Sequence, residues 1–118
     1  MPQPRYVPER GDVVWIDFNP TVGHEQAGHR PVLVLSPRTY NDFWGLFICC
    51  PITSKVKGYP FEVPILGHPD IAGVVLADQV KNLDWRSRRV TKKGRASERI
   101  VLETLGKLRA LLNWQDGA

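Results

Sequence analysis

The chain has 118 residues, of which 42% are hydrophobic and 24% charged. These are the values of an ordinary globular protein, and they exclude a disordered or fibrous class. The length predicts a single domain over residues 1–118, and the formal net charge of +4 favours an anionic partner.

The first residues, MPQPRYVPERG, carry prolines and charges where a secretory leader would need a continuous apolar segment. No later run approaches the ~20 apolar residues that a membrane span requires. We therefore expect a cytoplasmic protein without a membrane contact.

Five short runs rich in β-branched and aromatic residues predict strands. They cover residues 12–18, 31–36, 46–53, 61–66 and 73–80, and Gly, Pro, Asn or Asp bounds each of them. Strands at this spacing favour a small barrel or sandwich. Between the second and the third, residues 37–43 predict a short helical turn.

The last segment changes its period. Val101, Leu105, Leu108 and Leu112 recur at four, three and four residues, which predicts an amphipathic helix laid on the sheet, with Ser97 as its N-cap. The only two cysteines, Cys49 and Cys50, are adjacent in an apolar run. A strand would point them to opposite faces, so they indicate neither a disulfide framework nor a metal site.

The segment GHEQAGHRPVLVLS concentrates ionisable groups just before a predicted strand. His24 and Glu25 can exchange protons, and Arg30 offers a rigid fork of donors suited to phosphate oxygens. Together they could cleave a phosphodiester without a metal. The alternative is structural: Arg30 pairs with Glu25 across the loop, and the histidines are solvated.

Two further groups have a possible role on a nucleic acid. Thr53 and Ser54 end a predicted strand, where a hydroxyl either donates to a phosphate oxygen or caps a turn. Seven of the fourteen residues from Arg86 to Arg99 are basic. Such a run is commonly a solvated face, but beside Trp85 it would also suit an RNA backbone with a base to stack.

The order of these motifs resembles the MazF/PemK family of toxin endoribonucleases. The matching stretches are RGDVVWIDFNPTVGHEQAGHRPVLVLSP, PITS, KGYPFEV and VLADQVKNLDWR, and the resemblance extends from Tyr6 to Leu112. It implies an α+β, mainly β fold: a small SH3-like β-barrel with a C-terminal amphipathic helix. It also implies a homodimer, an antitoxin with an acidic disordered tail, and metal-independent cleavage of single-stranded RNA at short sequences with no cofactor.

The resemblance also implies site residues. Arg30 and Thr53 carry over as essential, and Glu25 as the expected general base, with His24 as the competing base. One branch of the family uses an arginine as the acid at the position where this chain has Leu76. In this chain the acid role would therefore fall to Arg30. The expected RNA-binding residues are Phe18, His29, Ser54, Lys57, Asp78, Gln79, Lys81 and Arg86. Trp15 is expected in the core.

The expected chemistry follows from the 2′-hydroxyl, which RNA has and DNA lacks. A base removes its proton, the oxygen attacks phosphorus, and the products are a 2′,3′-cyclic phosphate and a 5′-hydroxyl. Two alternatives remain open at this point. One is a toxin of the same fold that binds a protein such as a topoisomerase, and the other is a nucleic-acid-binding module without catalysis.

Overall fold

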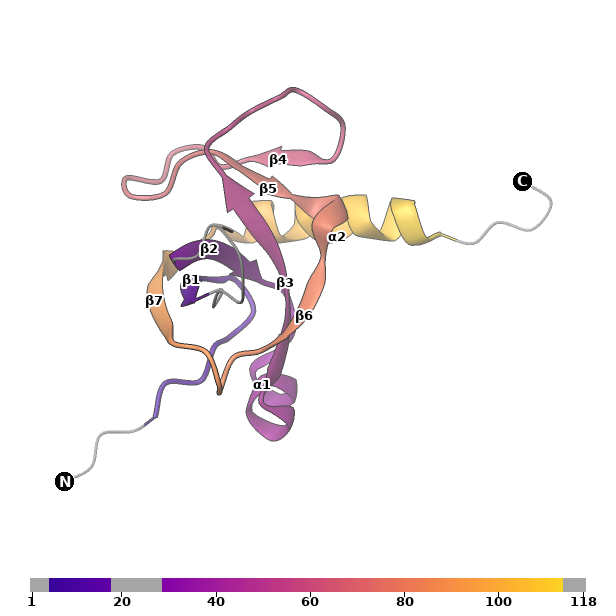
Figure 1. Cartoon of the computed structure of the whole chain (residues 1–118). Coiled ribbons are helices and arrows are strands. Elements are labelled where there is room, and N and C mark those ends of the chain that lie inside the picture. The colour runs from indigo at the N-terminus through magenta and orange to yellow at the C-terminus, as the bar shows by residue number, and fades with distance from the viewer. Residues whose placement is uncertain (1–4, 18–28, 114–118) are drawn as a thin grey trace, which may run out of the picture.

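The computed structural model describes residues 5–17 and 29–113. Within them the chain forms seven strands, two α-helices and one 3₁₀ turn (Figure 1). In chain order these are β1 (Asp12–Asp17), β2 (His29–Val34), α1 (Arg38–Trp44), β3 (Leu46–Thr53), β4 (Glu62–Pro64), β5 (Val74–Leu76), η1 (Ala77–Gln79), β6 (Lys81–Asp84), β7 (Val90–Arg95) and α2 (Glu98–Leu112).

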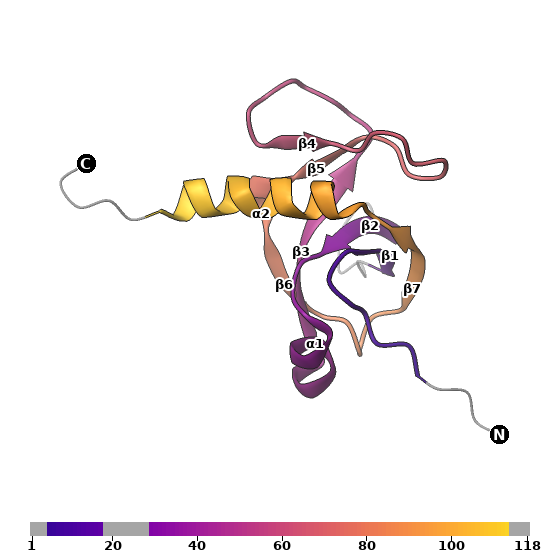
Figure 2. The same cartoon turned by 180° about the vertical axis from the view of Figure 1, so that it is seen from behind.

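The strands are antiparallel throughout and follow the order β4-β5-β3-β2-β1-β7, with β6 added on β3. The long strand β3 belongs to two sheets. Its first half pairs with β6 and its last residues pair with β5. The strands curl around a common interior, and α2 crosses behind them (Figures 1 and 2). The expected mainly β fold with a C-terminal helix is therefore confirmed.

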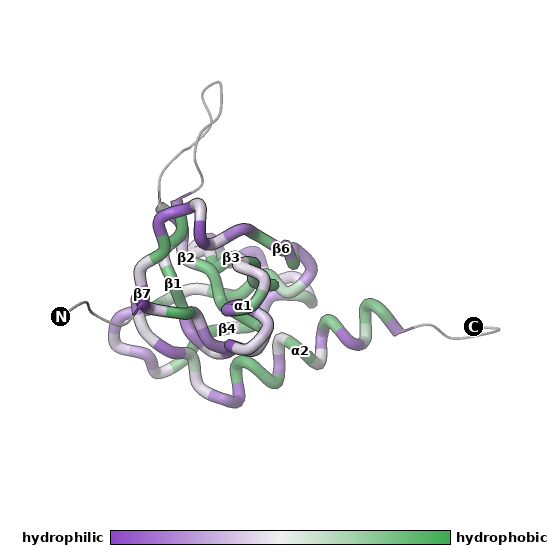
Figure 3. The backbone as a smooth tube through the Cα atoms, turned by 90° about the horizontal axis from the view of Figure 1, so that it is seen from below, coloured by the Kyte–Doolittle hydropathy of each residue, from purple (hydrophilic) through white to green (hydrophobic). Residues whose placement is uncertain are grey.

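Two apolar clusters occupy the two faces of this curled sheet, and alternate residues of each strand contribute to them. Val13, Leu33 and Cys50 belong to the cluster that α2 covers. Val14 and Cys49 belong to the other. The adjacent cysteines thus point to opposite faces, as the sequence predicts, and both are fully buried. Hydrophobic segments are concentrated in the central strands (Figure 3).

Helix α2 begins where Ser97 accepts a hydrogen bond from the backbone N–H of Ile100, so the predicted N-cap is confirmed. The predicted apolar stripe is confirmed at Val101 and Leu108, which are buried, and at Leu105, which packs against the core. It is wrong at Leu112, which is 72% exposed, and Ile100 and Thr104 are buried in addition. Thr104 is tolerated there because its hydroxyl donates to the Ile100 carbonyl at 2.9 Å.

Several element boundaries also differ from the prediction. The expected helical turn over residues 37–43 is present as α1. The expected strand over 73–80 ends at Leu76 and continues as the turn η1. The strand over 61–66 is shortened to β4. The sequence did not predict β6 and β7, whose lysines, arginines and asparagine lie on edges that face water.

The start of the chain is fastened to the barrel by Asp12, which is 1% exposed. Its carboxylate accepts hydrogen bonds from the Tyr6 hydroxyl, the Glu9 backbone N–H and, at 2.8 Å, the Arg95 guanidinium. Lys92 Nζ lies 3.7 Å away. Burial and then the hydrogen bond to Asp12 raise the pKa of Tyr6, which keeps its hydroxyl protonated as a donor.

Asn41 links α1 to the strands. It is fully buried, and its side chain bonds the Ser36 hydroxyl and the Pro8 carbonyl, while its backbone carbonyl accepts from the Trp85 indole N–H. Trp85 is therefore a core residue with its polar atom satisfied. None of the helices in the described segments is long and apolar enough to cross a membrane.

Candidate functional site

A pocket of about 540 Å³ brings together residues from five separate parts of the chain. Its walls are Trp15, Arg30, Pro31, Ile52, Thr53, Ser54, Lys55, Asp70, Ile71, Ala72 and Lys93. Arg30 and Thr53, which the sequence singles out on different strands, therefore share one cavity. Its lining includes three cationic side chains, those of Arg30, Lys55 and Lys93, and one carboxylate, that of Asp70.

Sheet pairing positions the two central residues. Arg30 lies opposite Ile16 in the β1–β2 ladder, and Thr53 lies opposite Val74 in the β3–β5 ladder. Arg30 is exposed, and among the described residues no hydrogen bond or ion pair engages its guanidinium. The fork is thus available to an anion, as a phosphate-binding arginine requires.

Thr53 is half-buried at the end of β3, and its hydroxyl oxygen accepts the Lys55 backbone N–H at 3.1 Å. The turn-capping role is therefore present. A hydroxyl that accepts one hydrogen bond still has its own proton to donate. Gly73 holds this end of β3 tightly: its φ is +112°, and a Cβ there would overlap the Thr53 carbonyl oxygen.

Trp15 forms a wall of the pocket, so its expected place in the core is wrong. It is only partly buried, and Lys93 Nζ lies 4.8 Å from the centroid of its ring. This is a cation–π distance. The neighbouring Lys92 instead turns toward Asp12, because successive residues of β7 face opposite sides. The two lysines therefore have different surroundings.

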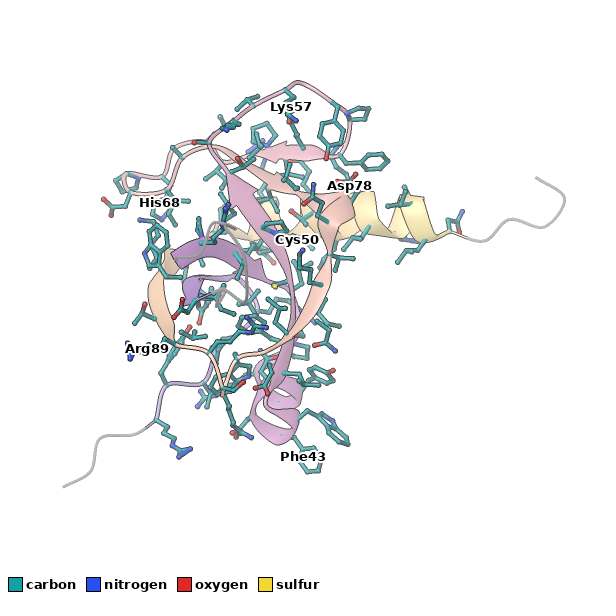
Figure 4. The ribbon with its side chains drawn as sticks, in the orientation of Figure 1. Phe43, Cys50, Lys57, His68, Asp78 and Arg89 are labelled. Atoms are coloured by element: carbon teal, nitrogen blue, oxygen red, sulfur yellow. The ribbon has the colours of Figure 1, made fainter. Side chains whose placement is uncertain are left out.

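A second, smaller pocket of about 150 Å³ shares Thr53 and Lys55 with the first. Lys57 and Gln79 line it, and Asp78 lies at its edge, where it accepts the Tyr59 hydroxyl at 2.8 Å. That hydrogen bond is the main cause of the raised pKa of Tyr59. Three expected RNA-binding residues thus gather beside Thr53, with Lys57 and Asp78 on the same side of the molecule (Figure 4).

The loop that carries Lys57 is held by a buried carboxylate. Glu62 accepts the backbone N–H of Lys57 at 2.9 Å and that of Gly58 at 2.8 Å. Lys107 of α2 donates to the Pro60 carbonyl at 2.7 Å. The second pocket therefore has a fixed wall.

Two expected RNA-binding residues lie apart from these pockets. Lys81 is on β6 opposite Cys49, and neither pocket includes it. Arg86 bonds the Asp42 carbonyl and carboxylate and lies over the ring of Trp85. It lines a separate cavity with Arg5, Tyr6 and Arg88. Trp85 itself is 8% exposed and packs in a core cluster, which disfavours the alternative in which its ring stacks on a base.

The remaining predicted site residues lie wholly or partly outside the described residues. Phe18, His24 and Glu25 lie in the segment 18–28. The alternative pairing of Glu25 with Arg30 falls outside the described residues as well, because it involves Glu25. For His29 the structure gives the backbone, which pairs with Asp17, but no side chain. Across residues 5–17 and 29–113, no group of three His, Cys, Asp or Glu side chains is arranged to hold a metal ion.

The sequence did not single out Lys55, Asp70 or Trp15 for this site. Lys55 had a weak signal, because it follows Thr53 directly. Trp15 had none: it stands in an unbroken apolar run, where alternation cannot tell a buried face from an exposed one. Asp70 reaches the pocket from a loop, and no periodicity applies to a loop.

Comparisons with known proteins identify the family of the chain. Residues 9–112 match the family model of PemK-like, MazF-like toxins of type II toxin-antitoxin systems. The endoribonuclease toxin MazF of Escherichia coli K12 is 58% identical over 90 residues, which are 76% of this chain and 80% of that protein. Endoribonuclease PemK of E. coli is 34% identical over 109 residues, covering 88% of this chain and 81% of its own.

A crystal structure of a MazE–MazF complex from Deinococcus radiodurans superposes with a TM-score of 0.88. It is 50% identical in sequence and covers 94% of this chain and 100% of its own. A small curled antiparallel sheet with a C-terminal helix is thus the fold that this chain shares with the toxins of type II toxin-antitoxin systems. The chain belongs to the MazF/PemK family of type II toxins. It is an endoribonuclease, and the reading as a binder without catalysis is set aside.

Proposed function

We propose that the chain cleaves single-stranded RNA at specific short sequences, without a metal, by attack of the 2′-hydroxyl on the adjacent phosphate. The products are a 2′,3′-cyclic phosphate and a 5′-hydroxyl. The observation that carries the proposal is the meeting of Arg30 and Thr53 in one cationic pocket. Residues 1–118 would form one toxin domain that acts in the cytoplasm, where messenger RNA is found.

In this mechanism Arg30 stabilises the phosphorane. Its guanidinium is unengaged among the described residues, and its fork matches two non-bridging oxygens. The Thr53 hydroxyl donates to one of these oxygens, while the Lys55 N–H fixes its orientation. Donors aimed at developing charge contribute ~3 kcal/mol each to transition-state stabilisation.

The proton transfers need a general base and a general acid. Glu25 is the proposed base, and His24 is the alternative, because an ordinary histidine pKa near ~6.5 is better matched to neutral pH. Both residues precede β2, the strand that carries Arg30. Arg30 would also act as the general acid that gives a proton to the leaving 5′-oxygen, and the proton that the base takes from the 2′-hydroxyl would balance this loss through solvent.

The first prediction concerns the metal. Arg30, Lys55 and Lys93 supply positive charge at the pocket, so we expect the purified protein to cleave a long RNA at its full rate in EDTA. The measurement is gel analysis of the fragments, with mass spectrometry of their ends. Loss of cleavage on chelation, with recovery on adding Mg²⁺, would refute the metal-independent mechanism.

The second prediction separates two neighbouring lysines. Lys93 lines the pocket and Lys92 does not, so Lys93→Ala should weaken RNA binding and lower the slope of log K against log salt by about 0.7. Lys92→Ala is the matched control and should leave that slope unchanged. The measurement is fluorescence anisotropy with a short labelled RNA at several salt concentrations. Equal slopes for the two variants would contradict the placement of RNA along Lys93.

The remaining expected contacts belong to the same proposal. Ser54, Lys57 and Gln79 would bind RNA from the two adjoining pockets. Asp78 would bind it from beside Tyr59 of the second pocket, and Phe18 and His29 would bind it from before and at the start of β2. Lys81 and Arg86 lie apart from these pockets and would contact only a longer RNA.

The structural relatives include complexes of MazF with MazE. We propose a corresponding partner for this chain, an antitoxin whose acidic disordered tail complements the net charge of +4. We also propose a homodimer. Exposed Leu102, Leu111 and Leu112 on α2, which are 58%, 45% and 72% exposed, support it.

A further inference from the structure

Asp70 is the acidic residue in the wall of the cationic pocket. Arg30, Lys55 and Lys93 line the same cavity. The Asp70 side chain is exposed, and no hydrogen bond or ion pair with another described residue engages its carboxylate. A carboxylate repels the phosphates that the other three residues would attract, so binding the RNA backbone does not account for it.

The loop that carries Asp70 is rigid, because His68 organises it from within. The Nδ1 atom of His68 accepts the backbone N–H of Asp70 at 3.0 Å and that of Ile71 at 3.1 Å. Its ring lies against Gly94 of β7, where a Cβ would contact it at 3.4 Å. Figure 4 labels His68 at the left of the molecule.

The two ends of the turn are fixed as well. Ile71 is 4% exposed and belongs to the cluster beneath α2. Gly73 follows, and its backbone is in close contact with the Thr53 carbonyl. The contacts of its neighbours with Thr53 and β7 therefore fix the position of Asp70. Its carboxylate takes no part in holding the turn. A group held this way at low cost in entropy is suited to recognition.

We propose that Asp70 determines specificity, by accepting a hydrogen bond from the exocyclic amino group of one base beside the scissile phosphate. This inference rests on the proposed RNA cleavage. An ionised carboxylate only accepts hydrogen bonds. Adenine, cytosine and guanine each present an amino group on the Watson–Crick edge. Uracil presents only one ring N–H, and the two carbonyl oxygens that flank this N–H repel a carboxylate. Single-stranded RNA exposes these edges.

The test is cleavage of a pool of short RNAs with random bases around the cut, followed by sequencing of the fragment ends. The wild type should select adenine, cytosine or guanine over uracil about tenfold or more at one position. Asp70→Ala should lose that preference while keeping the preferences at other positions. Asp70→Asn, whose amide can also donate, should accept uracil there.

The control is Glu103→Gln, which makes the same change in charge on α2 away from the pocket and should reproduce the wild-type preferences. Thermal melting checks that each variant is folded. If Asp70→Ala binds and cuts all sequences more strongly by one common factor, Asp70 acts only through its charge and the proposal is wrong. Unchanged preferences at every position overturn it as well. A wild type that cuts no RNA would overturn the proposed function and this inference with it.

Discussion

Replacing Arg30 by alanine should lower the rate of single-turnover RNA cleavage at least ~100-fold, with little loss of RNA affinity. The reason is that its fork would act on charge that appears only in the transition state, while Lys55 and Lys93 in the same pocket still attract the phosphates. The measurement is the cleavage rate of a short RNA at saturating enzyme, with affinity taken from anisotropy.

Arg30→Lys sharpens this prediction. Lysine keeps the positive charge but presents no planar fork, so the rate should stay low. Thr53→Ala should also lower the rate, though less, because it removes a single donor. If Arg30→Ala cuts at the wild-type rate once RNA saturates it, the catalytic role is wrong, and Glu25 with His24 become the centre of the site.

Replacing Asp12 by alanine should lower the free energy of unfolding by about 3 kcal/mol. The buried carboxylate accepts from Tyr6, Glu9 and Arg95, and its removal deprives the first two of their acceptor. Arg95 and Lys92 would be rehydrated, since their side chains are 50% and 45% exposed, which limits the cost. The measurement is urea denaturation followed by tryptophan fluorescence.

The matched control is Asp42→Ala, which breaks an ion pair with Arg86 between side chains that are 62% and 44% exposed. Exposed pairs contribute little, so the loss should stay below about 1 kcal/mol. An Asp12→Ala protein as stable as this control would mean that the buried carboxylate does not hold the first residues of the chain to the barrel.

The sequence predicted most of the central barrel because those strands are apolar and have clear boundaries. The runs that became β1, β2 and β3 are rich in Val, Ile and Leu and end at turn residues. It missed β6 and β7 because edge strands that face water need no apolar face, and their lysines and arginines are equally typical of a solvated loop. Backbone pairing with β3 and β1 forms these strands, and composition does not encode that pairing.

The candidate site was predictable only where motifs are local. Arg30, Thr53 and Ser54 follow from stretches of a few residues, and the structure brings them into one pocket. Arg86 belongs to an equally recognisable stretch but lies on Asp42 at α1, which only the tertiary fold decides. The position of Asp70 depends on a turn in which the His68 side chain accepts two backbone N–H groups. No residue spacing in the sequence predicts this arrangement.

The placement of Cys49 and Cys50 on the two faces of β3 has a redox consequence. They are the only thiols of the chain, both are fully buried, and burial raises the pKa of each to about 12. Oxidants and alkylating agents react with the thiolate, which is scarce at neutral pH under such a pKa and shielded by the core. The folded chain therefore presents no reactive thiol, and we expect these two cysteines to stay reduced whether its surroundings are oxidising or reducing.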